Sequence, residues 1–182
     1  MISIGIDPGW ASFGISVLDT SQPLSYKGSA SFVPKEFPSL LEFGEAVGAF
    51  IADTVGDSWT TNFQVHIERF VPYAGCPSAA SEMTNIVIGY LTGLFYLLST
   101  GTRKGDNLVV RHRAIDWKPV VCKDLVRTKN FSNPAASFDK KFSIAAAQEI
   151  SGLALKNDHI ADAICLSFLG VIHARRPKAP KG

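Results

Sequence analysis

The sequence predicts an α/β fold in which a five-stranded mixed sheet is flanked by helices. The first 33 residues read as three short strands joined by tight turns, which favours an antiparallel meander. Two further strand-like segments then alternate with segments of helical periodicity, the pattern of strand–helix–strand units. After residue 112 only helical segments follow. These helices are therefore expected to cover the sheet.

Each predicted strand is short and ends at a turn-forming or polar residue. Alternating apolar residues predict strands over residues 2–7, 13–19, 24–33, 63–68 and 108–112. Pro8 and Gly9 break the first strand, and a turn over residues 21–23 separates the second strand from the third.

Helical periodicity predicts five helices, over residues 39–54, 79–99, 117–127, 139–150 and 158–173. Asp139 is a suitable N-cap for the fourth helix, and residues 128–138 before it are expected to form a loop. The middle of the second helix, residues 86–98, is apolar nearly all round. A helix on a sheet needs only one apolar stripe. The excess indicates deep burial or a subunit interface, and we favour a homodimer formed through residues 79–99.

The net charge of +2 conceals a strong segregation of charge along the chain. Residues 1–100 carry three basic and nine acidic side chains, a net charge of −6. Residues 101–141 carry ten basic and four acidic side chains, a net charge of +6. Such asymmetry favours a surface that binds a polyanion beside an acidic site, although a solvated basic face would give the same pattern.

The length suits one domain over residues 1–173, followed by a basic and disordered tail over residues 174–182. Three cysteines without CxxC spacing argue against a disulfide framework or a structural zinc site. With no secretory signal and no apolar run long enough to cross a bilayer, we expect a cytoplasmic protein without a membrane partner.

Two predicted strands end in a carboxylate, Asp7 in the first and Glu68 in the fourth. A carboxylate at the end of an apolar strand is costly to bury unless another group compensates its charge. Asp7 has a simpler alternative role as a turn cap before Pro8 and Gly9. No local turn explains Glu68, which makes it the stronger functional candidate.

The last predicted helix adds Asp158, His159 and Asp162. Asp158 and Asp162 lie one turn apart on one face of that helix. Asp158 is also a natural N-cap, so a structural role is open for it.

If Asp7, Glu68 and Asp162 converge, their charges repel by about 4 kcal/mol for a pair 4 Å apart at an effective dielectric constant of 20. Divalent cations remove this cost, and oxygen ligands with one imidazole suit Mg²⁺ or Mn²⁺ better than Zn²⁺. Two such ions would activate water and stabilise the leaving oxygen of a phosphodiester. His159 is a candidate metal ligand or proton carrier.

The motifs, in their order along the chain, resemble the RuvC family of Holliday junction resolvases, which has the ribonuclease H-like fold. The first is Ile4-Gly5-Ile6-Asp7-Pro8-Gly9, followed by Gly14. The second is Ile67-Glu68-Arg69-Phe70, followed by Ala79, Ala80 and Gly89. The third is Asp158-His159-Ile160-Ala161-Asp162-Ala163. The resemblance covers about residues 2–173.

This resemblance implies a Mg²⁺-dependent endonuclease that resolves branched DNA by paired nicks and acts as a homodimer. Its metal-binding catalytic set would be Asp7, Glu68, His159 and Asp162, with two Mg²⁺ or Mn²⁺ ions per site. Asp158 would be a further metal ligand, a helix cap, or a carboxylate that assists from outside the ligand set. Phe70, with Tyr73 as a second candidate, would stack on bases at the junction centre, although core packing is an equal alternative for Phe70.

Basic residues of the segment 101–141 are the candidate phosphate contacts, and Lys118 and Lys140-Lys141 fall where the family has DNA-contacting lysines. The full predicted set is Arg111, Arg113, Lys118, Lys123, Arg127, Lys129, Lys140 and Lys141. One departure from the family is the stretch 123–139, which is longer than usual and bears on how a junction is gripped.

Three other functions compete with a junction resolvase. A ribonuclease H-like nuclease could instead act on an RNA–DNA hybrid or a flap, and a catalytically inactive protein could bind junctions without cleaving them. The start Gly5-Ile6-Asp7-Pro8-Gly9 also resembles the phosphate loop of actin-like ATPases and sugar kinases, but those proteins need two lobes and a much longer chain.

Overall fold

The computed structural model describes residues 1–21, 23–69, 78–99, 108–134 and 137–175. Five strands form one sheet in the order β3-β2-β1-β4-β5. Their bounds are β1 (Ile2–Asp7), β2 (Phe13–Asp19), β3 (Ser25–Phe32), β4 (Phe63–Glu68) and β5 (Val109–His112). The first three strands pair antiparallel, while β4 runs parallel to both β1 and β5. The predicted mixed sheet with its antiparallel meander is confirmed.

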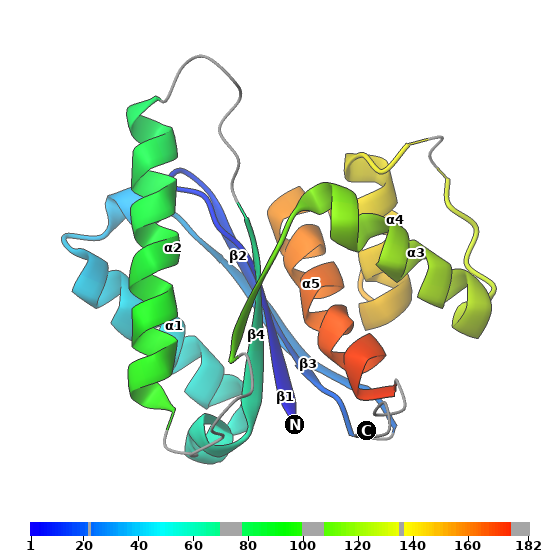
Figure 1. Ribbon diagram of the computed structural model, residues 1–182, viewed down its shortest axis with the longest axis horizontal. Coiled ribbons are helices and arrows are strands. Elements are labelled where there is room, and N and C mark those ends of the chain that lie inside the picture. Colours follow the sequence, from blue (N-terminus) through cyan, green and yellow to red (C-terminus); the bar gives the residue numbers. More distant parts are fainter. Residues whose placement is uncertain (22, 70–77, 100–107, 135–136, 176–182) are drawn as a thin grey trace, which may run out of the picture.

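Helices cover both faces of this sheet. Their bounds are α1 (Leu40–Val55), α2 (Ala79–Leu98), α3 (Ala114–Lys129), α4 (Lys140–Ser151) and α5 (Asp158–Arg175). Figure 1 shows α1 and α2 on one side of the sheet and α3, α4 and α5 on the other. Two short 3₁₀ turns, Pro34–Glu36 and Asp57–Thr61, flank α1.

The alternation of side chains along β1 separates the two faces. Ile4 and Ile6 belong to the core cluster that includes Phe43 of α1 and Val87 of α2. Ser3 and Gly5 face the opposite side, where α5 lies. Asp7, the last residue of β1, follows in the same alternation and is directed to the α5 side.

Helix α5 packs unusually close to the sheet because small residues line the contact. A Cβ atom added to Gly5 would lie 2.0 Å from the Ala163 carbonyl oxygen, and one added to Gly14 would lie 2.2 Å from the His159 carbonyl oxygen. Ser3 Oγ donates a hydrogen bond of 2.6 Å to the Ser167 carbonyl oxygen. These contacts fix the height of α5 above β1 and β2, and with it the position of the acidic first turns of α5.

Three details differ from the predictions. Helix α3 begins at Ala114 rather than at residue 117, because the Arg113 side chain makes two hydrogen bonds to Asp116 that stabilise an earlier first turn. Asn157, and not Asp158, caps α5, since Asn157 Oδ1 accepts from the Ile160 backbone N–H. Helix α5 continues through Arg175, so residues 174 and 175 of the predicted tail are helical. Residues 176–182 lie outside the described residues.

Helix α2 is apolar on two faces, as its sequence indicates. Val87, Leu91 and Phe95 are buried against the sheet. Ile86 is 49% exposed and Leu97 is 86% exposed. In the single chain, deep burial therefore does not explain why α2 carries apolar side chains on a second face.

Three further expectations concern the cap of α4, the cysteines and membrane-spanning helices. Asp139 is the N-cap of α4 and accepts hydrogen bonds from the backbone N–H groups of Lys141 and Phe142. Cys122 and Cys165 are free thiols, and Cys76 lies outside the described residues. None of the described helices has the length and hydrophobicity that a membrane crossing requires.

We predict that Gly5→Ala destabilises the protein by roughly 3 kcal/mol or more, because its new Cβ would meet the α5 backbone rather than a flexible side chain. The free energy of unfolding, measured by urea denaturation, tests this. Gly48→Ala in α1 is the matched control, since nothing lies within 4 Å of its added Cβ. The control should be stabilised by about 0.5–1 kcal/mol. Equal changes in the free energy of unfolding for the two substitutions would show that the α5 backbone does not pack as closely on Gly5 as described.

Candidate active site

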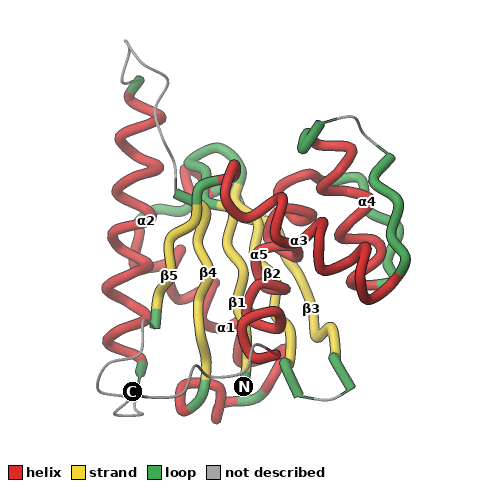
Figure 2. The backbone as a smooth tube through the Cα atoms, turned by 45° about the vertical axis from the view of Figure 1, so that its right-hand side comes forward, coloured by secondary structure: helices red, strands yellow, loops and turns green. Residues whose placement is uncertain are grey.

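The site lies at the carboxyl ends of the parallel strands β1 and β4. Asp7 and Glu68 are the last residues of these neighbouring strands, whose register pairs Ile6 with Ile67. The first turns of α5 supply Asp162 and His159 from above the same edge. Figure 2 shows β1 and β4 as neighbouring strands of the sheet, with α5 in the helical layer that covers it. The structure thus brings together four residues predicted from three separate segments.

Asp7 and His159 form a close pair, with 2.6 Å between Asp7 Oδ2 and His159 Nδ1. Burial raises the pKa of Asp7. The hydrogen bond from His159 lowers this pKa, and the nearby Asp162 carboxylate raises it. The same hydrogen bond to Asp7 is the main reason that the pKa of His159 is raised. Within the described residues, the Asp7 carboxylate therefore bonds to an imidazole on a distant helix rather than to a local turn.

Glu68 is held by a tryptophan that follows it by 49 positions. Trp117 Nε1 donates a hydrogen bond of 2.8 Å to Glu68 Oε2. Burial, together with the nearby Asp7 and Asp162 carboxylates, raises the pKa of Glu68 to about 7 against the opposing effects of the Trp117 hydrogen bond and of Lys118. Asp7 and Asp162 therefore lie near enough to Glu68 to disfavour its ionised form.

Asp162 forms an ion pair with Lys118 of α3, with 3.5 Å between Lys118 Nζ and Asp162 Oδ1. Both side chains are largely buried, with 12% of Lys118 and 18% of Asp162 exposed. Within the described residues, Asp162 Oδ1 is buried and receives no hydrogen bond. Lys118 supplies a positive charge near this oxygen but no hydrogen bond, and a buried carboxylate oxygen without a hydrogen bond is costly.

The described side chains of the site are donors of the kind that a divalent metal prefers, but their present arrangement is not that of a metal site. Among the described residues, no group of three or more Asp, Glu, His or Cys side chains is arranged to hold an ion as it stands. In this arrangement Lys118, His159 and Trp117 each contact one of the three carboxylates. The chemistry of the donors still fits Mg²⁺ or Mn²⁺, since three carboxylates converge and one oxygen lacks a hydrogen bond. Metal ligation at Asp162 would require its carboxylate to turn away from Lys118.

Asp158 lies at the start of α5 and pairs with Lys140 at the start of α4. This contact lowers the pKa of Asp158. The pair connects the starts of α4 and α5.

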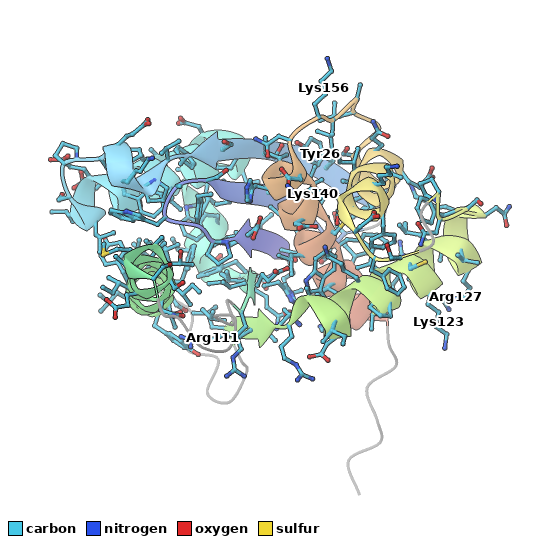
Figure 3. All side chains as sticks on the ribbon, turned by 90° about the horizontal axis from the view of Figure 1, so that it is seen from above. Tyr26, Arg111, Lys123, Arg127, Lys140 and Lys156 are labelled. Carbon is cyan, nitrogen blue, oxygen red and sulfur yellow. The ribbon has the colours of Figure 1, made fainter. Side chains whose placement is uncertain are left out.

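The predicted basic residues are spread over several surfaces. Figure 3 shows Lys123 and Arg127 near each other at one end of the molecule and Arg111 toward the opposite end. Arg127 pairs with Asp124, Lys129 with Glu149, and Arg113 with Asp116. Arg111 donates to Thr92 of α2. Lys141 and Lys123 are exposed, and Phe70 and Tyr73 lie outside the described residues.

Two features of the site were not predicted. Trp117 was assigned only to a helix, and its contact with Glu68 has no sequence signal beyond its position beside Lys118. A group of histidines, His66, His112 and His173, lies on the same side of the sheet as Glu68. Burial lowers the pKa of His112 to about 4 and that of His66 well below its usual value. The alternation of β4 places His66 and Glu68 on one face, which could have indicated this group.

We predict that Glu68→Gln stabilises the metal-free protein at pH 8. The folded-state pKa of Glu68, about 7, lies above the ordinary pKa of a glutamate side chain, 4.5. The stability associated with Glu68 is thus fully present below pH 4.5 and is lost as the pH rises through 7. After allowance for partial solvent screening, the variant should gain about 2 kcal/mol at pH 8 and nothing near pH 4.5.

Urea denaturation in a chelating buffer at the two pH values measures this difference. Glu45→Gln on α1 is the control, because Glu45 is exposed and distant from the site. A Glu68→Gln variant that is no more stable than the wild type at pH 8 would contradict a buried, mutually repelling cluster.

Comparison with known proteins identifies the fold. No protein-family model matches the sequence, and no curated protein matches it. Among solved structures, T. thermophilus RuvC in complex with Holliday junction substrate superposes with a TM-score of 0.63 and 15% identity over 96% of each chain. The structure of Thermus thermophilus RuvC gives a TM-score of 0.60 and 17% identity over 96% of each chain. The chain therefore has the RuvC-like, ribonuclease H-like fold that its motifs predict.

Proposed function

We propose that this protein is a metal-dependent endonuclease that cleaves four-way DNA junctions or related branched DNA. The observation that carries the proposal is the convergence of Asp7, Glu68 and Asp162 beside His159 at one end of the sheet. A protein gains nothing in stability from gathering three carboxylates so that the pKa values of two of them, Asp7 and Glu68, are raised. A catalytic role explains why such a cluster is present.

The likeness in fold supports the choice of substrate. One of the similar structures is a RuvC protein in complex with a Holliday junction substrate, and the likeness covers 96% of both chains. We infer a junction as the substrate from this likeness together with the ordered motifs, while the carboxylate cluster carries the proposed chemistry.

Asp7, Glu68, Asp162 and His159 are the residues that would hold Mg²⁺ or Mn²⁺, with two ions per site. When bound, the ions would lower the pKa of a water molecule and neutralise charge on the scissile phosphate. Lys118 Nζ, released from Asp162, can bind a phosphate oxygen. The His159 imidazole, 37% exposed and held at Nδ1 by Asp7, can accept a proton at Nε2 if it leaves the metal.

The basic residues of α3 and α4 are proposed to hold the DNA backbone. Lys123 and Lys141 are exposed, and Lys140 pairs with Asp158 at the start of α5. Arg111, Arg113, Arg127 and Lys129 would have to exchange a present hydrogen-bond or ion-pair partner for phosphate. Such contacts position the duplex and carry little sequence information. Phe70 and Tyr73 remain candidates for base stacking.

A homodimer through α2 is proposed from the exposed apolar side chains of that helix. Ile86, Tyr96 and Leu97 form the exposed apolar face, and each is about half exposed or more. Burial of such a face against a second copy would remove it from water. Two sites related by a two-fold axis would account for paired nicks in a junction.

We predict that Asp7→Asn lowers the rate of Mg²⁺-dependent cleavage of a synthetic four-way junction on the order of 1,000-fold. Binding to the junction in a chelating buffer should stay within about twofold of the wild type, because phosphate contacts dominate affinity. Gel assays of cleavage and binding measure both. Asp53→Asn, an equivalent change on the exposed surface of α1, should retain full activity.

The substrates of this assay separate the remaining alternatives. Matched linear duplex, flap and RNA–DNA hybrid should be cleaved much more slowly than the junction. Faster cleavage of a hybrid or a flap would identify a different ribonuclease H-like nuclease. Tight junction binding by the wild type without any cleavage would identify a non-catalytic binding protein.

A further inference from the structure

We propose that Trp117 is a positioning residue for Glu68, which fixes one carboxylate oxygen so that the other is presented to a metal ion shared with Asp7 and Asp162. The inference rests on the proposed function, because it assigns the orientation of one proposed metal ligand to a residue outside the ligand set.

The contact between the two side chains is short and protected from water. Trp117 Nε1 lies 2.8 Å from Glu68 Oε2, and only 1% of Trp117 is exposed. A buried indole N–H requires an acceptor, and the carboxylate is a strong one. In the described part of the chain, the Glu68 carboxylate accepts its hydrogen bond from Trp117 Nε1, at Oε2. Oε2 is therefore committed to the indole, and Oε1 is the oxygen left for another ligand.

The ring of Trp117 is itself held firmly. It belongs to the core cluster that contains Val121, Phe142 and Phe168. Its position in that cluster leaves the indole N–H little freedom to follow a moving carboxylate. The orientation of Glu68 is thus set by the packing between α3 and the helices that surround it.

The first turns of α3 act on two carboxylates at once. Trp117 binds Glu68, and the next residue, Lys118, pairs with Asp162. Lys118 Nζ also lies 5.1 Å from the centre of the Trp117 ring. The two contacts differ in chemistry. The lysine is a cation that an arriving metal ion can replace, whereas the indole is a neutral donor that can stay in place when the metal binds.

Groups that hydrogen-bond to metal ligands commonly set metal affinity, and their removal lowers it about 10–100-fold. Trp117→Phe removes the indole N–H and retains an aromatic ring in the core. We expect the Mg²⁺ concentration for half-maximal junction cleavage, and the Mg²⁺ dissociation constant from calorimetry, to rise by about that factor. Junction binding in a chelating buffer should remain unchanged.

Trp59→Phe provides a matched control. Trp59 is 6% exposed and packs against Phe63 and Phe95 in the other core cluster, away from the carboxylates. It should lose stability as Trp117→Phe does, but its Mg²⁺ dependence should equal that of the wild type. If the two variants show the same Mg²⁺ dependence, the positioning role of Trp117 is wrong.

A second measurement needs no change at Trp117. The protein has three tryptophans, Trp10, Trp59 and Trp117, so its ¹H–¹⁵N spectrum contains three indole signals. Addition of Mg²⁺ should shift the Trp117 signal and leave that of Trp59 in place. Glu68→Gln should abolish the shift. A Trp117 signal that does not respond to Mg²⁺, in a wild-type protein that binds the ion, would overturn the proposal.

The two levels of the proposal fail in different ways. A wild-type protein that neither binds Mg²⁺ nor cleaves a junction overturns the proposed function and this inference together. A wild-type protein that does both, with an unaltered Mg²⁺ dependence in Trp117→Phe, overturns only the role of Trp117.

Discussion

The close approach of α5 to β1 and β2 is the constraint on which the site depends. Gly5 and Gly14 leave no room for a side chain beneath the α5 backbone, and Ser3 ties the same helix to β1. Because of this contact, Asp162 and His159 lie beside the ends of two parallel strands. The glycines of the first motif thus act through packing, and they place catalytic candidates that are about 150 residues away in the sequence.

The carboxylate cluster is maintained against its own repulsion by three neighbours of different kinds. His159 holds Asp7, Lys118 pairs with Asp162, and Trp117 donates to Glu68. Even with these partners, the pKa values of Asp7 and Glu68 are raised and Asp162 Oδ1 lacks a hydrogen bond. This pattern is typical of a functional site whose stability is lower than its packing would allow. The proposed divalent cation would offset the remaining repulsion.

The sequence allowed the fold and the acidic cluster to be predicted because both depend on local patterns. Strand alternation located Asp7 and Glu68 at strand ends, and helical periodicity located Asp162 and His159 on one turn. The contact of Trp117 with Glu68 could not be predicted, since it depends on where α3 begins and how it crosses the end of β4. The cap of α5 was assigned to Asp158 as one alternative because two capping residues are adjacent there, and the structure selects Asn157. The placement of Phe70 and Tyr73 stays untested.

The central claim is that Asp7, Glu68 and Asp162 together bind divalent metal. Anomalous diffraction from crystals of the wild-type protein grown with Mn²⁺ tests it most directly. The account predicts manganese peaks among these three carboxylates, with Lys118 displaced from Asp162 and Trp117 still bonded to Glu68. Well-diffracting crystals with no manganese at the ends of β1 and β4, and with Lys118 still paired with Asp162, would contradict it.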